Sequence, residues 1–270
     1  MKKIAALICL AMAFLLIFTS CENQKEEYTE EENLPELVIG RDEYSPYSYT
    51  DESGNVVGVD ADIAREACRR MGYKPVFVLI DWEDRDSFLE NGEGDCVWSC
   101  FSMNNREDDY LWAGPYLDTR IIVAVKSDSG FNTKEDLNGA VFGVQAGSRS
   151  EDLLLKYDSS EVQARYVYCF RSLTEALTAL HQGYVDAVGG QESGMMSNIE
   201  NLPAEYRLME DSARPSYVGV AFYKNGNKEL AEALEKTLNE MAEDGTIQSV
   251  LDKYNITSDK VETGGNADDR

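Results

Sequence analysis

Two patterns of apolar and polar positions alternate along this chain. Short apolar runs of strand length are separated by longer stretches that carry an apolar stripe at helical spacing. The apolar runs predict strands over residues 37–39, 47–49, 56–57, 76–80, 95–99, 121–125, 140–144, 167–169, 185–188 and 218–223. The striped stretches predict helices over residues 60–71, 84–89, 150–157, 172–183, 229–243 and 247–254. This alternation is typical of an α/β protein whose parallel sheets are covered by helices.

Local signals refine some of these elements. Ser172 and Glu175 form a capping box at the start of one helix, and Gly72 is suited to end another. The run at 76–80 is almost continuously apolar, so we expect a strand that is buried on both faces.

The N-terminal end predicts export. Lys2 and Lys3 precede an apolar segment over residues 4–18, which has the length of a signal-peptide core and is short for a membrane span. Small residues and then Cys21 follow, a pattern that resembles a bacterial lipobox, although Phe18 is unusual three positions before the cysteine. The resemblance implies that residues 1–20 are removed and that acylated Cys21 anchors the chain in the membrane. The alternatives are a secreted protein cut elsewhere and a single-pass anchor.

Charge separates the ends from the core. Residues 22–36 contain seven Glu and one Lys, so we expect residues 21–36 to be a disordered acidic tether and 261–270 a disordered tail. The roughly 225 residues between them suit two small domains or one large one. The net charge is −25 and no basic patch occurs, which argues against nucleic acid as a partner.

The segment over residues 36–106 carries the most specific order of motifs. A strand leads into an Asp/Tyr loop, a hairpin leads to a capped helix, a second strand ends near Trp82, and a third strand ends in serines followed by Arg106. A second β/α series follows, with a loop at Ser148, and two helices close the chain around Gly245.

This order resembles the extracellular solute-binding proteins of polar amino acid ABC transporters, family 3. The resemblance covers about residues 37–256 and implies a two-lobed periplasmic-binding-protein-like fold of type II with two chain crossings, near Val123 and Val220. Lobe 1 would then comprise 37–124 and 221–260, and lobe 2 would comprise 125–220. A monomeric, lipid-anchored protein on the extracellular or periplasmic face is implied, which captures a small polar solute such as an amino acid and delivers it to an ABC permease.

The resemblance also assigns ligand contacts residue by residue. Arg106 would grip a ligand α-carboxylate with a bidentate fork, and its alternative is a surface pairing with Glu107 or Asp108. Asp42 matches an acidic residue that meets the side-chain cation in binders of basic amino acids. The full predicted binding set is Asp42, Tyr44, Tyr47, Trp82, Ser99, Cys100, Ser102, Arg106, Ser148 and Gln191.

Within this set, aromatic and small polar residues accompany the charged Asp42 and Arg106. The aromatic walls are Tyr44, Tyr47 and Trp82. The small polar groups on the third strand are Ser99, Cys100 and Ser102, and Ser148 opens a helix whose N–H groups suit a carboxylate.

One position departs from the family pattern. The family places an Asp where Gln191 stands, and that Asp pairs with the ligand α-ammonium. Three alternatives follow: Glu192 substitutes, the ammonium is weakly held, or the ligand has no ammonium. Asp186, five residues earlier, is expected to be structural.

Other chemistry finds little support in the sequence. His181 is the only histidine, no P-loop or dinucleotide fingerprint occurs, and we therefore expect no metal site, no cofactor and no enzyme. Of the remaining cysteines Cys68, Cys96, Cys100 and Cys169, we expect buried free thiols, with a Cys68–Cys96 disulfide as the alternative. Two rival functions stay open: an enzyme like the cyclohexadienyl dehydratases, with Glu192 or Asp42 as its carboxylate, and a ligand sensor for a membrane receptor.

Overall fold

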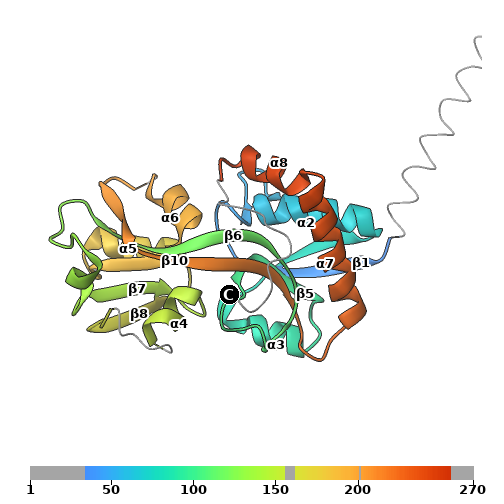
Figure 1. Ribbon diagram of the computed structural model, residues 1–270, viewed down its shortest axis with the longest axis horizontal. Coiled ribbons are helices and arrows are strands. Elements are labelled where there is room, and N and C mark those ends of the chain that lie inside the picture. The colour runs from blue at the N-terminus through green and yellow to red at the C-terminus, as the bar shows by residue number, and fades with distance from the viewer. Residues whose placement is uncertain (1–33, 156–161, 201, 257–270) are drawn as a thin grey trace, which may run out of the picture.

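A computed structural model shows two α/β lobes joined by two long strands, β6 (Leu111–Lys126) and β10 (Tyr206–Phe222) (Figure 1). The structure describes residues 34–155, 162–200 and 202–256. The predictions for the signal peptide, for Cys21, for most of the acidic tether and for the C-terminal tail fall outside these residues. Within the described part, none of the helices combines the length and apolar character that a membrane crossing requires.

Lobe 1 contains the parallel strands β4 (Lys74–Leu79), β1 (Glu36–Arg41) and β5 (Cys96–Ser102). All seven residues of β5 are buried, because this strand lies inside the sheet between β1 and β10. By contrast, β4 lies at the sheet edge and is only half-buried, so the expectation of a strand buried on both faces was wrong. An edge position leaves one backbone edge of the strand open to solvent, which the apolar sequence alone does not reveal.

Helices cover the sheet of lobe 1. They are α2 (Val59–Met71), α3 (Arg85–Glu90), α7 (Lys228–Glu243) and α8 (Thr246–Lys253), with the 3-10 turn η1 (Trp82–Asp84) before α3. The predicted stripe of α2 is buried except for Met71, which is partly buried, and Gly72 ends this helix with a left-handed φ of 74°. Ahead of α2, the short strands β2 (Tyr49–Thr50) and β3 (Val56–Val57) form the predicted hairpin.

Lobe 2 repeats this plan with strands β8 (Tyr166–Phe170), β7 (Val141–Gln145) and β9 (Ala187–Gln191). Its helices are α4 (Arg149–Leu155), α5 (Leu173–Gln182) and α6 (Glu192–Ile199), with the 3-10 turn η2 (Lys134–Leu137). Ser172 caps α5 by accepting a hydrogen bond from the Glu175 backbone N–H, as the capping box predicted.

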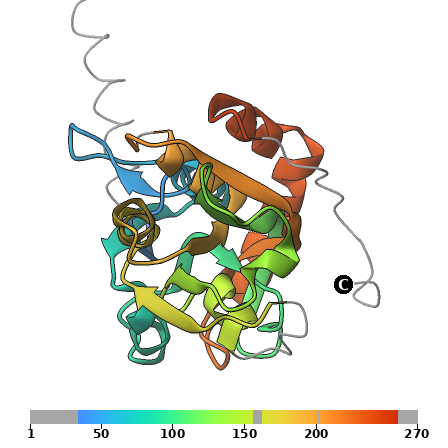
Figure 2. The ribbon, with the colours of Figure 1, turned by 90° about the vertical axis from the view of Figure 1, so that its left-hand side faces the viewer.

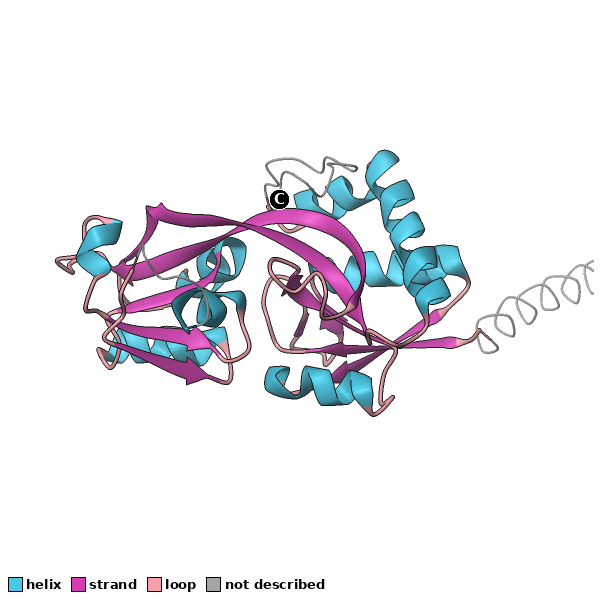
Figure 3. Cartoon of the chain, turned by 60° about the horizontal axis from the view of Figure 1, so that its bottom comes forward, coloured by secondary structure: helices cyan, strands magenta, loops and turns pink. Residues whose placement is uncertain are grey.

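An equivalent hydrogen bond lies at the start of a parallel strand in each lobe. Asp95 precedes β5 and its carboxylate accepts from the Val38 N–H at 2.8 Å, while Asp186 precedes β9 and accepts from the Val141 N–H at 2.8 Å. The structural role expected for Asp186 is therefore present. The carboxyl ends of β1, β5, β7 and β9 face the gap between the lobes, which is where ligands bind in open α/β sheets (Figure 3).

The two long strands form an antiparallel ladder that runs from one lobe into the other (Figure 3). Their hydrogen-bonded register shifts twice, between Met209 and Arg214 and between Val218 and Val220 of β10. The predicted strands at 121–125 and 218–223 are thus the ends of elements of 16 and 17 residues. The polar residues between those ends hid the length of both strands from the apolar pattern.

Other expectations are corrected or extended. The sheet is mixed, because β5–β10, β10–β6 and β6–β9 are antiparallel pairs. Helix α6 was not predicted, and β1 begins at Glu36, one residue inside the expected tether. The view along the long axis shows helices on both sides of the sheet in lobe 2 (Figure 2).

The described cysteines are all free thiols, so the alternative of a Cys68–Cys96 disulfide is not realised. Cys68, Cys96 and Cys100 are buried as expected, and burial raises the pKa of the Cys68 thiol to about 12. Cys169 is exposed, contrary to the expectation, because it lies on the edge strand β8.

Candidate functional site

A cavity lies between the two lobes, and nine of the ten predicted binding residues line it. From lobe 1 these are Asp42, Tyr44, Trp82, Ser99, Cys100, Ser102 and Arg106, and from lobe 2 they are Ser148 and Gln191. Tyr47 is fully buried and does not line the cavity. Its ring lies behind that of Tyr44, with the two centroids 6.0 Å apart. The prediction that Tyr47 is a wall residue is therefore not supported by its position, and Tyr47 instead supports Tyr44.

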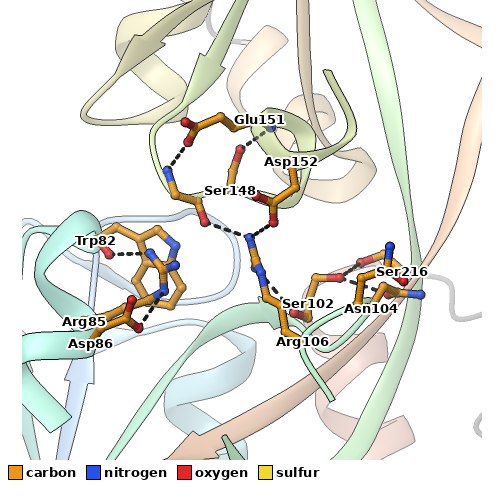
Figure 4. A network of polar contacts seen from close by, with 12 residues as sticks. Trp82, Arg85, Asp86, Ser102, Asn104, Arg106, Ser148, Glu151, Asp152 and Ser216 are labelled. Atoms are coloured by element: carbon orange, nitrogen blue, oxygen red, sulfur yellow. Dashed lines mark hydrogen bonds and ion pairs between the residues drawn. The ribbon is translucent and has the colours of Figure 1, made fainter. Parts of the chain in front are cut away.

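Arg106 is the central cation of the site. Its guanidinium lies over the Phe101 ring, with Cζ 5.1 Å from the ring centroid, and it donates to the Gly147 carbonyl of lobe 2 at 3.1 Å. It also forms a buried ion pair with Asp152 of α4 (Figure 4). Burial lowers the pKa of Arg106 from its usual range, and the charge of Asp152 opposes that change. Because Arg106 is buried and pairs with Asp152, the alternative of a surface ion pair with Glu107 or Asp108 is excluded.

Asp42 is the anionic group of the cavity. Its carboxylate accepts one hydrogen bond from the Ser99 hydroxyl and another from the Gln145 side-chain amide of lobe 2, the latter at 2.7 Å. Burial raises the pKa of Asp42, against these hydrogen bonds. The neighbouring Glu43 points elsewhere, since it pairs with Arg41 and accepts from Thr50. Asp42 alone can therefore present a carboxylate to a ligand from this loop.

Tyr44 closes one wall against lobe 2. Its hydroxyl accepts from the Gln191 backbone N–H at 3.3 Å, and its ring lies against Gly194 of α6. A Cβ at Gly194 would come within 2.8 Å of a Tyr44 ring carbon, so only glycine leaves room for this contact. Glu192, one of the candidates for replacing the missing acidic residue, is instead paired with Arg120.

The wall formed by Trp82 is an aromatic and cationic cluster. Trp82 packs edge-on against Phe101 with centroids 5.0 Å apart, and the Arg85 guanidinium lies 5.4 Å from the Trp82 ring and 5.2 Å from the Phe101 ring. Arg85 also donates to the Trp82 carbonyl at 2.9 Å (Figure 4). These contacts fix the indole at the cavity wall.

Cys100 shapes the floor through its backbone. It has a left-handed φ of 48°, which is uncommon for a residue with a side chain, and its N–H donates to the buried Asp60 carboxylate at 2.6 Å. Asp60 also accepts from the Tyr116 hydroxyl at 2.6 Å. Burial raises the pKa of Asp60 to about 6. Asp60 thus holds the backbone of the cavity floor in an otherwise unfavourable conformation.

Ser148 lies at the start of α4, as the sequence predicted. Its hydroxyl accepts from the Glu151 N–H at 3.2 Å, and the Glu151 carboxylate accepts from the Gly147 N–H at 2.5 Å. These two bonds satisfy backbone donors that a ligand carboxylate was expected to use. A hydroxyl that accepts can still donate its own proton, so Ser148 keeps one donor for a ligand.

Several lining residues were not in the predicted set. They are Phe101, Ile121, Gln145, Arg149, Ser150, Leu173, Gly189 and Gly190. Gln145 ends β7 and Arg149 begins α4, so their positions on either side of the predicted loop were the available signal. Ile121 and Leu173 carried no signal, because apolar residues in a strand or helix usually face a core.

Contacts across the cavity hold the lobes together. Besides the contacts of Arg106, Asp42 and Tyr44, the hydroxyls of Ser45 and Ser197 lie 3.0 Å apart and Arg171 pairs with Asp81 at the rim. The cavity has a volume of about 40 Å³, room for only a few water molecules. A ligand of amino-acid size therefore requires the lobes to separate.

The fold and this interlobe site define a solute-binding protein with two lobes. The chain belongs to the bacterial extracellular solute-binding proteins, family 3, whose pattern matches residues 37–257. A probable histidine-binding protein of Campylobacter jejuni is 24% identical over 255 residues, covering 90% of this chain and 97% of that protein. The lysine/arginine/ornithine-binding periplasmic protein of Escherichia coli is 29% identical over 236 residues, covering 82% of this chain and 88% of that protein.

A solved structure confirms the fold class. An ancestral arginine-binding protein bound to arginine superposes with a TM-score of 0.72 and 29% identity, covering 81% of this chain and 97% of that chain. The predicted two-lobed type II fold is therefore confirmed.

Proposed function

We propose that this chain is the binding subunit of an ABC importer, which captures an amino acid or a similar small polar solute by closure of its lobes. One observation carries the proposal: a buried guanidinium, Arg106, and a buried carboxyl group, Asp42, line one interlobe cavity. Opposite charges at two places in one cavity suit a small molecule that is itself charged at two places. The relatives named for histidine, and for lysine, arginine and ornithine, support an amino acid.

The remaining parts of the proposal concern the whole chain. Residues 1–20 would be a signal peptide, and acylated Cys21 would tether a monomer to the outer face of the cell membrane beside its permease. The lobes would move as units bounded at 37–124 with 221–260 and at 125–220. Closure would be a hinge motion favoured by ligand contacts made with both lobes at once.

A thermal-shift screen tests the proposal directly. Candidate amino acids, dipeptides, polyamines and small carboxylates are each added to the purified protein. A ligand present at 100 times its Kd should raise the free energy of unfolding by about 2.7 kcal/mol. If no amino acid raises the melting temperature while a compound of another class does, the proposed ligand class is wrong. Loss of uptake of the identified ligand on gene deletion would then separate transport from a sensing role.

A second function is favoured by one observation, the raised pKa of Asp42 inside the cavity. A buried carboxyl group of this kind can act as a general acid or base, and an enzyme like the cyclohexadienyl dehydratases would need such a group. Glu192, the other carboxylate considered, pairs with Arg120 and does not line the cavity. Incubation of the protein with a cyclohexadienyl substrate distinguishes the two functions. Product formation that is lost in Asp42→Asn supports the enzyme, and unchanged substrate supports the binding protein.

A further inference from the structure

Gln191 stands at the end of β9, in the cavity wall, with only 6% of its surface exposed. A side-chain amide can present either an oxygen or an NH₂ group to a ligand, and the two choices favour opposite ligand groups. Its neighbours decide between them, because a chain of hydrogen bonds leads from Gln191 to a backbone N–H.

The chain of hydrogen bonds starts at Tyr217. The Tyr217 backbone N–H donates to the side chain of Asn104 at 2.9 Å, and a backbone N–H can only donate, so the Asn104 atom there is the oxygen Oδ1. The Ser102 hydroxyl lies 3.0 Å from the same oxygen. Since a carbonyl oxygen only accepts, Ser102 must donate its single proton to Asn104 (Figure 4).

The next two bonds follow from this one. Ser216 Oγ lies 3.0 Å from Ser102 Oγ, and because the Ser102 proton is already used, Ser216 must donate to Ser102. The Gln191 amide lies 2.9 Å from Ser216 Oγ, and because the Ser216 proton is also used, Gln191 must donate through Nε2. The orientation of the amide is thereby fixed without reference to a ligand.

The other atom of the amide, Oε1, is buried and accepts no hydrogen bond from the described part of the protein. We propose that Asn104, Ser102 and Ser216 form a relay that holds Gln191 Oε1 at the cavity as a fixed acceptor, which selects ligands that present an N–H donor there. Asn104 and Ser216 are positioning residues that act through Gln191. The inference rests on the proposed capture of an amino acid and names how its amino group is recognised.

The relay has a chemical consequence that a carboxylate at this position would not have. A neutral oxygen accepts from an ammonium or from an uncharged N–H, and it places no buried negative charge in the wall. A ligand that presents an acceptor or an apolar group at this place leaves Oε1 without a partner, which disfavours its binding.

Neutron diffraction from a deuterated crystal of the protein without added ligand tests the relay. The expected result is two deuterons on the Gln191 atom that faces Ser216, with the Ser216 deuteron directed at Ser102 and the Ser102 deuteron directed at Asn104. Deuterons on the other terminal atom of the Gln191 amide would overturn the proposal.

Calorimetry tests the selectivity. The probes are L-arginine and L-histidine, each compared with its counterpart that lacks the α-amino group, 5-guanidinopentanoate and imidazolepropanoate. We expect the wild-type protein to prefer an amino acid over its counterpart by at least about tenfold in Kd. Ser216→Ala removes the acceptor of Nε2 and frees the amide, so this preference should fall by about threefold or more.

Asn104→Asp is the matched control, because its carboxylate still accepts from Tyr217 and Ser102 and the preference should be kept. A merely structural role of Ser216 would weaken both members of a probe pair equally, and an unchanged ratio in Ser216→Ala therefore overturns the proposal. If the wild-type protein binds neither pair, the proposed function fails for these ligands, and the deuteron positions still decide the relay.

Discussion

Arg106 and Asp152 form an ion pair that joins the two lobes beside the candidate ligand cavity, and both side chains are almost fully buried. The arginine expected to grip a ligand carboxylate therefore already holds a carboxylate of its own chain. A ligand that uses Arg106 must share it with Asp152 or displace it, so the pair opposes ligand entry. This relationship leads to two predictions.

Arg106→Ala should abolish tight binding of a carboxylate ligand, because the ligand loses a charge-assisted fork at a cost of several kcal/mol, about 2–5. The same change leaves Asp152 buried without its arginine, so the free energy of unfolding should also fall, by about 3–5 kcal/mol. Calorimetry and urea denaturation measure the two effects.

The double variant Arg106→Ala with Asp152→Asn separates these two roles. Removing both charges should restore much of the stability and none of the affinity. Affinity within threefold of wild type in either variant would contradict the role given to Arg106.

Asp152→Asn alone should tighten the binding of a carboxylate ligand, by about tenfold in Kd, because the ligand no longer competes with a second carboxylate for Arg106. The variant should be less stable than wild type when no ligand is present, since a buried guanidinium keeps its charge and loses its counterion. Glu240→Gln, on the exposed face of α7, controls for the change in net charge. Weaker binding in Asp152→Asn would show that Asp152 itself contacts the ligand.

Gly194→Ala should hinder closure. The added Cβ would lie 2.8 Å from a ring carbon and 2.9 Å from the hydroxyl oxygen of Tyr44, so the two lobes could not approach as they do here. We expect about tenfold weaker binding with no loss of stability, because alanine favours a helix over glycine by about 1 kcal/mol. Gly130→Ala, where no atom lies within 4 Å of the new Cβ, is the control. Small-angle scattering should show a larger radius of gyration for Gly194→Ala with ligand present, and an unchanged radius would refute the closure argument.

Asp60 should make the stability depend on pH below neutrality. Burial raises its pKa to about 6 from the usual 3.8, so the folded protein binds this proton more tightly than the unfolded chain does. The contribution of Asp60 to stability is therefore largest below about pH 4 and is lost as the pH rises to about 6, by about 3 kcal/mol in total. Asp60→Asn should remove this step while Cys100 keeps an acceptor. Denaturation curves at several pH values compare the two proteins, and parallel pH profiles would disprove the assignment.

Cys21→Ser should release the protein from the membrane, since acyl chains on Cys21 are proposed as its anchor. Fractionation of cells that express the full chain should move it from the membrane pellet to the soluble exported fraction. A Cys9→Ser variant, changed inside the proposed signal segment, should remain in the pellet. Pelleting of processed Cys21→Ser would contradict the anchor.

The sequence predicted the elements whose apolar periodicity is strong. The stripe of α2, the capping box of α5 and the apolar run of β5 each gave a local signal, and each element is present. The long crossing strands were predicted only at their ends, because polar residues such as Asp118 and Arg120 interrupt their apolar pattern in the ribbon between the lobes. The sequence also gives no local signal that a strand lies at the edge of the sheet. For this reason β4 and Cys169 were wrongly predicted to be buried.

The candidate site was predictable where strand ends carry unusual polar or aromatic residues, as at Asp42, Ser102 and Arg106. Contacts between lobes were not predictable, because they join residues distant in the sequence whose meeting depends on how the lobes close. Asp152 and Ser216 are the clearest cases: one lies inside a short helix and the other inside a long strand. Neither position differs from an ordinary polar residue until Arg106 and Ser102 are placed beside it.

The two register shifts between β6 and β10 divide their ladder into three segments of regular pairing with two irregular joints. Sliding one strand past the other would break ladder hydrogen bonds along a whole segment, whereas bending between Met209 and Arg214, where the pairing is already interrupted, would break fewer of them. Opening of the protein should therefore be close to a rotation about the joint at 209–214, with little translation or shear. A molecule restricted in this way returns to the same closed geometry each time, so Ser148 and Gln191 of lobe 2 return to the same places opposite Asp42 and Arg106 of lobe 1.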